Sequence, residues 1–470
     1  MLLCKAYAEH VVKTYTIYLM AVNIRSQMTS STPTNPVKAT PIFVPMLLVI
    51  IVVVTFYPGF MSYDTIHALV SARNGVLDSM WPPMVSYVWA LVDFVWPHPW
   101  VMFLVQVMTL MLSINFIVYR CTGSYLYTAL ALVAYLAVPV ILGTVVVIWK
   151  DVLMAAIFLA ALAFMLPEEP PHMNLRKIAR SSVALLLIFI GLCVRHNGVF
   201  AAVPLVYLFS LNVLRQGAPV RKRIPIRELI LTLGIVILLF TGKTVIDMYS
   251  LPSLNKLSSS TEFFIRSVRI LDIAGASVCA NQNLFDELAP TLSVAQIADG
   301  YDARHINLSS KVLTAVPENA NVNSVWLRVA AHHPICFMSN KASMTAYLLG
   351  VEPGDQFAIT SPGIDTNPYG YKLAESHDRD VVVEYIVSMS KVDFLRPWFL
   401  YVVTSFLLLM STYLKRVTTE VCVISASGFF YFASLVLFGN AADARLPFYS
   451  TTAVLLTFAL LLYENLREIK

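Results

Sequence analysis

Asp64 is the residue whose type and position point most directly to chemistry. It lies in the stretch Pro58 to Pro83, PGFMSYDTIHALVSARNGVLDSMWPP, directly after the apolar run Pro41 to Tyr57, which is long enough to cross a bilayer. A carboxylate at such a place can accept the proton of a hydroxyl group that attacks an electrophilic carbon. The alternative is that Asp64 caps the helix predicted from Asp64 to Asn74.

Three basic residues at predicted helix ends supply a second kind of chemistry. Lys150, Arg195 and Arg445 each border an apolar segment, and cationic side chains there can stabilise the charge of a leaving phosphate. His196 is a further candidate for binding the phosphate. The supporting polar residues are Arg73, Asp78, Asp151, Asn197 and Asp443.

Each of these residues also has a plainer explanation. Lys150-Asp151 can be a charged turn between two apolar helices, and Arg195 can be an anchor whose head group reaches the membrane interface. Asp443 and Arg445 can form an internal salt bridge, and Asp78 can be solvated. A shared location of these residues is therefore the stronger argument, since ionisable residues at membrane depth are costly and need partners.

The elements that must position these residues are apolar helices. The 470-residue chain is 58% hydrophobic and 13% charged, against about 25% charged residues in soluble domains. The composition therefore predicts an all-α polytopic membrane protein. Its net charge of +5 comes from short basic clusters between apolar segments, which does not indicate a nucleic-acid partner.

The apolar segments predict about ten transmembrane helices. Their approximate ranges are 41–57, 99–119, 126–148, 152–166, 182–194, 199–214, 229–247, 397–414, 420–439 and 446–463. The fifth and sixth are separated only by Arg195-His196-Asn197-Gly198, and we expect a hairpin with these residues at its tip. One continuous helix would place a charge near the middle of the bilayer, at a cost of at least about 2.5–3.5 kcal/mol.

Basic residues orient these predicted helices. With residues 1–40 as a cytoplasmic tail, every second connection carries Lys or Arg, usually in a cluster, as the positive-inside rule requires. Asp64, Lys150, Arg195 and Arg445 then all lie on the outer side. Tryptophans at the predicted outer ends agree with this orientation, because their rings favour the headgroup layer.

The chain is expected to have four parts. These are the tail 1–40, a transmembrane catalytic module 41–247, a mainly α extracytoplasmic domain 248–396 and C-terminal transmembrane helices 397–470. Residues 82–96 of the first outer loop are expected to form a helix in the membrane interface, with a re-entrant segment as the alternative. Cys279 and Cys336 of the external domain can pair in an oxidising compartment, or remain two buried thiols.

No motif indicates a resident cofactor. The six cysteines have no Cys-x-x-Cys spacing, and the neighbours His332 and His333 point to opposite sides. We predict no metal-ligating residues, while a divalent metal ion at the phosphate is left open.

The stretch YPGFMSYDTIHALVSARNGVLDSMWPP (Tyr57 to Pro83) resembles the first-loop motif of bacterial members of the GT-C superfamily of membrane glycosyltransferases, which includes the protein mannosyltransferases and the aminoarabinose transferase of lipid A. WKD at 149–151 and RHNG at 195–198 are also similar to stretches of those proteins, and DARLPFY at 443–449 is so more weakly. The resemblance extends through about residue 214 and does not cover the external domain. One departure is Trp81, where a His commonly precedes the Pro-Pro pair.

This resemblance implies that Asp64 is the catalytic base and that Lys150, Arg195 and Arg445 contact the phosphate of the sugar donor. The expected reaction is transfer of a sugar from a polyprenyl phosphate to an extracytoplasmic glycan, lipid or protein, with inversion. The expected location is a bacterial inner membrane, with the active site facing the periplasm or exterior.

Two other functions remain open at this point. O-antigen polymerases and ligases are also polytopic with a large external loop, but they usually rely on external Arg and His residues rather than on a carboxylate after the first span. A transporter or flippase tends to place ionisable residues near the bilayer midplane and to contain inverted repeats, and neither feature is visible in this sequence.

Overall fold

The architecture is helical, as the composition predicts. The computed structural model describes residues 42–77, 81–166, 175–214, 226–250, 254–285, 288–303, 311–317, 320–351, 359–439 and 443–468. Within these ranges the regular elements are helices, and the only extended pairing consists of two isolated β-bridges.

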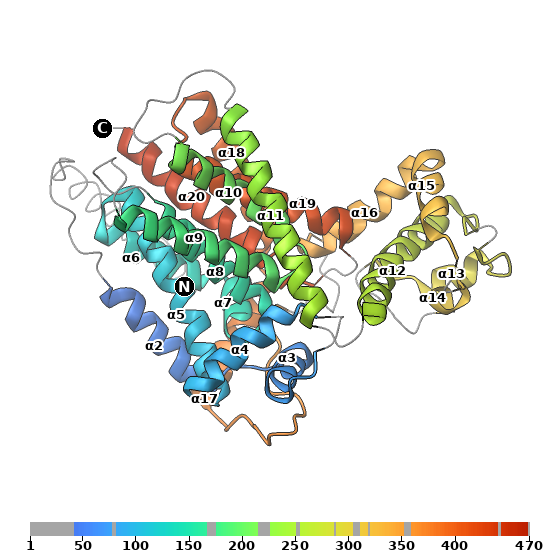
Figure 1. Ribbon diagram of the computed structural model, residues 1–470, viewed down its shortest axis with the longest axis horizontal. Helices are drawn as coiled ribbons and strands as arrows, with labels where there is room; N and C mark the ends of the chain where they lie inside the picture. Colours follow the sequence, from blue (N-terminus) through green and yellow to red (C-terminus); the bar gives the residue numbers. More distant parts are fainter. Residues whose placement is uncertain are drawn as a thin grey trace, which may run out of the picture.

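The elements are drawn in Figure 1. In chain order they are α2 (Phe43–Thr55), α3 (Tyr63–Asn74), α4 (Pro83–Val95), α5 (Pro99–Thr122), α6 (Tyr125–Ala137), α7 (Pro139–Val145), α8 (Lys150–Met165), α9 (Leu175–Val194), α10 (Gly198–Leu214), α11 (Ile226–Ser250), α12 (Leu254–Ala280), α13 (Val294–Gly300), α14 (Lys311–Ala315), α15 (Val322–His332), α16 (Pro334–Leu348), α17 (His377–Ser390), the 3₁₀ turn η2 (Asp393–Leu395), α18 (Pro397–Tyr413), α19 (Thr419–Phe438) and α20 (Phe448–Glu468).

Several helices match the length and composition of membrane spans. Among the described residues these are α5, α9, α11 and α19, and there are five spans if α6 and α7 count as one. The predicted span 126–148 is bent by 80° between α6 and α7, where Pro139 begins the second helix. Other predicted spans coincide with shorter apolar helices, namely α2, α10 and α18. The chain is thus a helical membrane protein.

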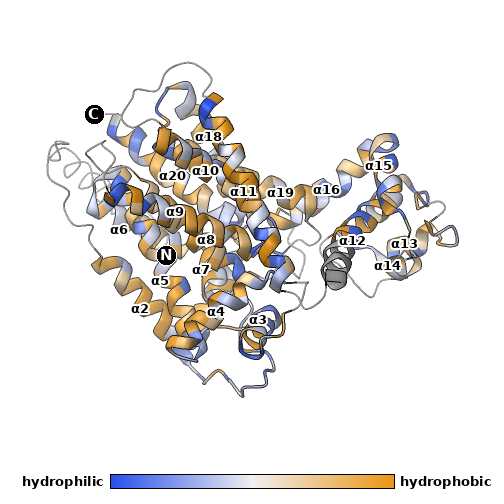
Figure 2. Ribbon diagram, in the orientation of Figure 1, coloured by the Kyte–Doolittle hydropathy of each residue, from blue (hydrophilic) through white to orange (hydrophobic). Residues whose placement is uncertain are grey.

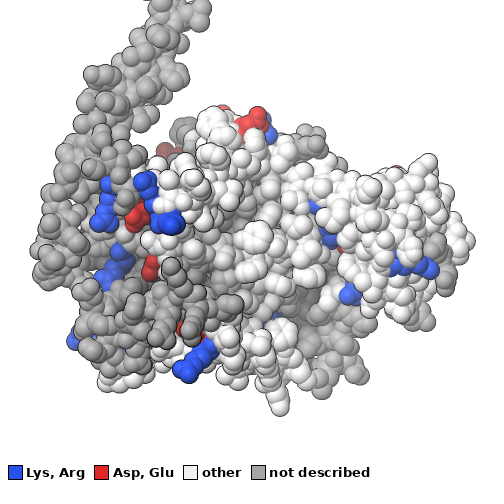
Figure 3. Space-filling view, turned by 90° about the horizontal axis from the view of Figure 1, so that it is seen from above, with Lys and Arg blue, Asp and Glu red and all other residues white. Residues whose placement is uncertain are grey.

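The surface agrees with this class. The main bundle is mostly apolar along its helices, with polar residues gathered toward helix ends (Figure 2). On the face drawn in Figure 3, charged side chains form small groups separated by broad uncharged areas. Large apolar side chains such as Leu233, Leu238 and Phe406 are exposed, which is the arrangement expected of helices that face lipid rather than water.

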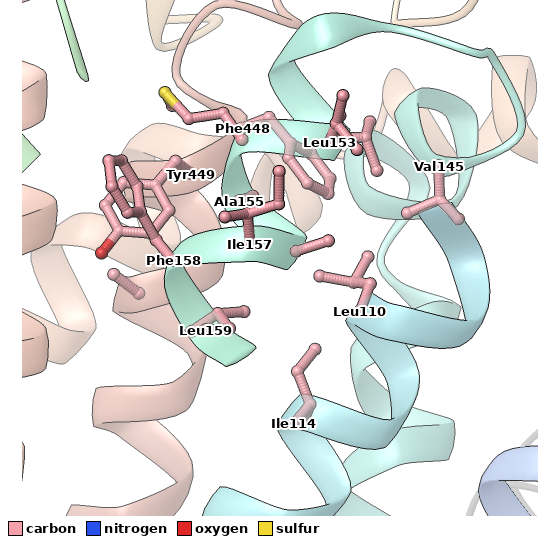
Figure 4. Close-up of a cluster of buried hydrophobic side chains, with 14 of the residues drawn as sticks. Leu110, Ile114, Val145, Leu153, Ala155, Ile157, Phe158, Leu159, Phe448 and Tyr449 are labelled. Atoms are coloured by element: carbon pink, nitrogen blue, oxygen red, sulfur yellow. The ribbon is translucent and has the colours of Figure 1, made fainter. Parts of the chain in front are cut away.

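Helix α8 lies at the centre of the main bundle. Its side chains are buried on nearly all sides, as expected for a helix that is apolar around its whole circumference. It packs against α5, α9 and α20, and Figure 4 shows Phe158 of α8 beside Tyr449 of α20. A Cβ on Gly191 of α9 would lie 2.7 Å from the Phe158 ring, so α9 can approach α8 this closely only with glycine at this position.

A second core lies in the first part of the predicted external domain. Residues of α12 to α15, including Ile270, Ile297 and Val325, form an apolar cluster separate from the main one, and they stand beside the bundle in Figure 1. Cys279 and Cys336 form a disulfide there, which settles the alternative left open by the sequence.

The later part of that predicted domain belongs to the main bundle. Ile359 and Ile386 are members of the main core, and the hydroxyl of Tyr385 donates a hydrogen bond of 2.7 Å to the carbonyl of Ala137. The segment 248–396 therefore contributes to two cores. Its chain returns across the end of the bundle that carries α3 and α4 (Figure 1).

Candidate functional site

Asp64 lies in the first turn of α3. The N-cap position of this helix belongs to Ser62, so Asp64 is not its capping residue. The Asp64 side chain is 19% exposed, and its Oδ2 lies 2.9 Å from Nη1 of Arg445. Two residues from opposite ends of the chain thus meet in one ion pair.

Backbone hydrogen bonds hold the chain just before Asp64 against two other segments. The amide of Phe60 donates to the carbonyl of Val146 at 3.0 Å, and the amide of Ile148 donates to the carbonyl of Phe60 at 2.9 Å. On the other side, the amide of Met61 donates to the carbonyl of Gly363 at 3.0 Å. The chain leading to α3 is therefore held between the segment before α8 and the segment around Gly363 that returns from the second core.

Side chains continue this attachment. The Trp149 indole N–H donates to the hydroxyl of Ser62 at 2.8 Å, and the hydroxyl of Thr65 donates to the carbonyl of Ile148 at 2.7 Å. These bonds flank Asp64 on both sides in sequence. They fix the first turn of α3 against the start of α8, where Lys150 lies.

Arg445 is held by three contacts besides Asp64. Its Nε lies 2.8 Å from Oδ2 of Asp443, and its backbone amide donates to Oδ1 of the same carboxylate at 3.1 Å. Its guanidinium carbon lies 4.9 Å from the centroid of the Trp149 ring. The Asp443–Arg445 salt bridge, the plainer explanation that the sequence left open, is present, and the same arginine also reaches Asp64.

Lys150 shares a pocket with Asp64. Its Nζ lies 3.9 Å from the centroid of the Trp81 ring, so the tryptophan that replaces the expected His provides a cation–π contact. The pocket has a volume of about 20 Å³, and Asp64, Trp81, Trp149 and Lys150 line it. Such a volume is enough for roughly one water molecule.

Arg195 and Asp151 form a separate, more deeply buried ion pair. The side chain of Asp151 is 2% exposed and that of Arg195 is 12% exposed. The pair joins the start of α8 to the end of α9. The charge of Arg195 also acts on Lys150, as do the charges of Asp64 and Arg445, so the two ion pairs belong to one electrostatic group.

The RHNG hairpin tip has the predicted form. Helix α9 ends at Val194 and α10 begins at Gly198, and the amide of Gly198 donates to the carbonyl of Arg195 at 3.0 Å. His196 is exposed at this tip and Asn197 is half-buried.

Two of the predicted supporting residues take no part in this cluster as described. Nε of Arg73 lies 2.6 Å from Oδ2 of Asp93, and its guanidinium carbon lies 4.4 Å from the centroid of the Tyr369 ring. Arg73 thus ties α3 to α4 and to the return segment. Asp78 lies outside the described residues.

Sequence reasoning missed the ion pair between Lys243 and Asp247 in α11. Both side chains are buried, and the pair is spaced i,i+4 on one helix. The charge of Lys243 acts on the His196 ring together with those of Lys150 and Arg195. The available signal was two opposite charges one turn apart in an otherwise apolar span, which is costly unless the charges pair.

Trp149 and Ser62 were also missed as parts of the site. A tryptophan near the end of a span is usually interpreted as an interfacial anchor. Only the fold shows that Trp149 contacts both Arg445 and Ser62.

The assembled cluster combines a carboxylate, Asp64, with two kinds of cation: Lys150 lines the same small pocket, and Arg445 contacts Asp64 from outside that lining. Asp64 can accept a proton, and Lys150 of the same pocket and Arg445 beside Asp64 are cations that can stabilise a negative charge near this carboxylate. Among the described residues, no three His, Cys, Asp or Glu side chains lie close enough together to hold a metal ion. No protein-family model, no curated protein and no solved structure matches this chain.

Proposed function

We propose that this protein is a membrane glycosyltransferase that moves a sugar from a polyprenyl-phosphate donor to an extracytoplasmic acceptor. The acceptor is a surface polysaccharide, a lipid or a protein. The observation that carries the proposal is that Asp64 contacts Arg445 and lines one pocket with Lys150, at the end of an apolar helix bundle.

The proposed chemistry uses these three groups in distinct roles. Asp64 accepts the proton of the acceptor hydroxyl as that oxygen attacks the anomeric carbon. The bond between this carbon and the phosphate oxygen breaks, and its electron pair leaves with the phosphate. Lys150 and Arg445 stabilise the negative charge that develops there.

Arg195 has a supporting role in this proposal. Its buried pairing with Asp151 makes it a group that positions the start of α8. Its positive charge also contributes to the electrostatic potential at Lys150, where the phosphate is proposed to bind. His196 and Asn197 border this region at the hairpin tip. The assignment of His196 to phosphate binding rests on the resemblance to GT-C proteins.

The proposed topology has ten crossings and a cytoplasmic N-terminus, with the site facing the periplasm or exterior of a bacterial inner membrane. Basic residues between alternate apolar segments support this orientation. The Cys279–Cys336 disulfide supports an oxidising compartment for the external region. The prenyl tail of the donor would remain among apolar helices while its phosphate reaches Lys150 and Arg445.

The test is transfer of a radiolabelled sugar from a set of polyprenyl-phosphate sugars by the purified protein. With Asp64→Asn we expect a loss of transfer of about 10²–10⁴-fold, because the base is removed while the shape is kept. Unchanged transfer by this variant, or no transfer by the wild-type protein with any of the sugars, would contradict the proposal.

Asp365→Asn is the matched control. Asp365 is exposed, and its backbone amide donates to the carbonyl of Met61 at 2.9 Å, a bond that the substitution leaves in place. It lies next to the segment that leads to α3 but outside the pocket, so its transfer rate should equal that of the wild-type protein.

A further inference from the structure

Two nitrogens of the Arg445 guanidinium contact different carboxylates. Its Nε contacts Asp443 at 2.8 Å, and the backbone amide of Arg445 contacts the other oxygen of the same carboxylate at 3.1 Å. This double attachment spans only two residues and so constrains the arginine locally. Nη1, in contrast, contacts Asp64 at 2.9 Å across the site.

We take the Nη1 contact as the exchangeable one because of where its partner lies in the chain. The side chains of Arg445 and Asp64 are 20% and 19% exposed, and partly exposed ion pairs contribute about 0.2–1 kcal/mol. Asp443 is more exposed, at 36%, but it lies two residues from Arg445 and also accepts a hydrogen bond from the Arg445 backbone amide, so it stays beside Arg445 when Nη1 changes partner. A phosphate oxygen is an equally suitable partner for a guanidinium N–H. Asp443 and the Trp149 ring hold the guanidinium in position while its Nη1 changes partner.

We propose that Arg445 couples binding of the sugar donor to release of the base. The donor phosphate replaces the Asp64 carboxylate at Nη1, and Asp64 then becomes free to accept the acceptor proton. This inference rests on the proposed function and adds an order to it: the sugar donor binds before the acceptor hydroxyl is activated.

The geometry favours the same order. While Nη1 of Arg445 contacts Oδ2 of Asp64, this carboxylate oxygen is occupied by the guanidinium. A phosphate that takes over Nη1 leaves Oδ2 of Asp64 open to the hydroxyl group of the acceptor.

Binding of farnesyl phosphate to the purified protein, measured by calorimetry in detergent, tests this coupling. Asp64→Asn removes the group that competes for Nη1. We expect it to lower the Kd of farnesyl phosphate by about two- to fivefold, the range that corresponds to a weak ion pair. Asp365→Asn should leave the Kd unchanged. A second variant, Asp64→Ser, should behave as Asp64→Asn does.

The Arg445→Gln background separates the coupling from a general effect of charge. There the gain from Asp64→Asn should disappear, because no guanidinium remains to be released. A gain that persists in this background, or a Kd in Asp64→Asn equal to or above that of the wild-type protein, would overturn the coupling while leaving the glycosyltransferase proposal in place. A wild-type protein that neither binds the probe nor transfers sugar would overturn both.

Discussion

At the scale of residues, the site is organised by pairing of opposite charges. Asp64 pairs with Arg445, and Asp151 pairs with Arg195. The two pairs differ in depth: the first is partly exposed and can exchange partners, whereas the second contains an aspartate that is only 2% exposed. Removing one partner of a buried pair leaves an uncompensated charge in a low-dielectric interior.

Arg195→Ala should therefore destabilise the fold by about 3–5 kcal/mol, because Asp151 is left buried and unpaired. The double variant Asp151→Leu/Arg195→Met should recover most of this loss, since it leaves no buried charge at this position. The measurement is the free energy of unfolding in mixed micelles. Equal destabilisation of the single and double variants would show that the pair is not the source of the effect.

At the scale of elements, close packing of α8 and α9 sets the distance between Asp151 and Arg195. Gly191 lies on α9, four residues before Arg195, and faces Phe158 of α8. A side chain at Gly191 must push the two helices apart or displace the ring. The ion pair at the ends of the same two helices would then be disturbed as well.

Gly191→Ala should cost about 1–3 kcal/mol of stability, the usual range for overpacking a core, and should also reduce the proposed sugar transfer. Gly234→Ala in α11 is the control, because no atom lies within 4 Å of a Cβ there and alanine favours helix more than glycine does. Thermal unfolding in detergent distinguishes the two variants. Equal midpoints for Gly191→Ala and the wild-type protein would contradict the close-packing argument.

At the scale of the whole molecule, two cores are joined by a polar contact and stabilised differently. The ammonium of Lys341 lies 2.8 Å from Oδ1 of Asp272 on α12, a helix of the second core, and it also donates to the carbonyl of Leu437 at the end of α19 at 3.2 Å. Burial raises the pKa of Asp272, and the Lys341 charge opposes this shift. The second core has a disulfide, whereas the described cysteines of the main bundle, Cys121, Cys193 and Cys422, are free.

Cys336→Ser should destabilise the second core by about 2–5 kcal/mol, because the disulfide joins residues 57 positions apart and restricts the unfolded chain. The measurement is the rate of proteolysis within residues 254–351, with and without reductant. Cys422→Ser is the control, since Cys422 is exposed and unpaired. A Cys336→Ser protein as resistant as the wild-type protein would contradict a stabilising role of the disulfide.

The sequence by itself determined the helical membrane class and several local features. The helix at 63–74, the helix in the first outer loop and the break at Arg195-His196-Asn197 follow from local composition, since apolar runs and turn residues act within a few positions of one another. The number of spans was less well determined, because helix length and composition identify four or five in the described residues. Tertiary packing can bury or bend a short apolar helix in ways that hydropathy does not report.

Only the tertiary structure decided which charges meet. Among the predicted cations, Arg445 pairs with Asp64, Arg195 pairs with Asp151, and Arg73 pairs with Asp93 outside the cluster. From sequence alone these residues differ little, since each is a charge near the end of an apolar segment. Their partners are set by contacts between helices that are distant in the chain. The residue pattern along one helix does not predict which side chain of another helix faces it across the bundle.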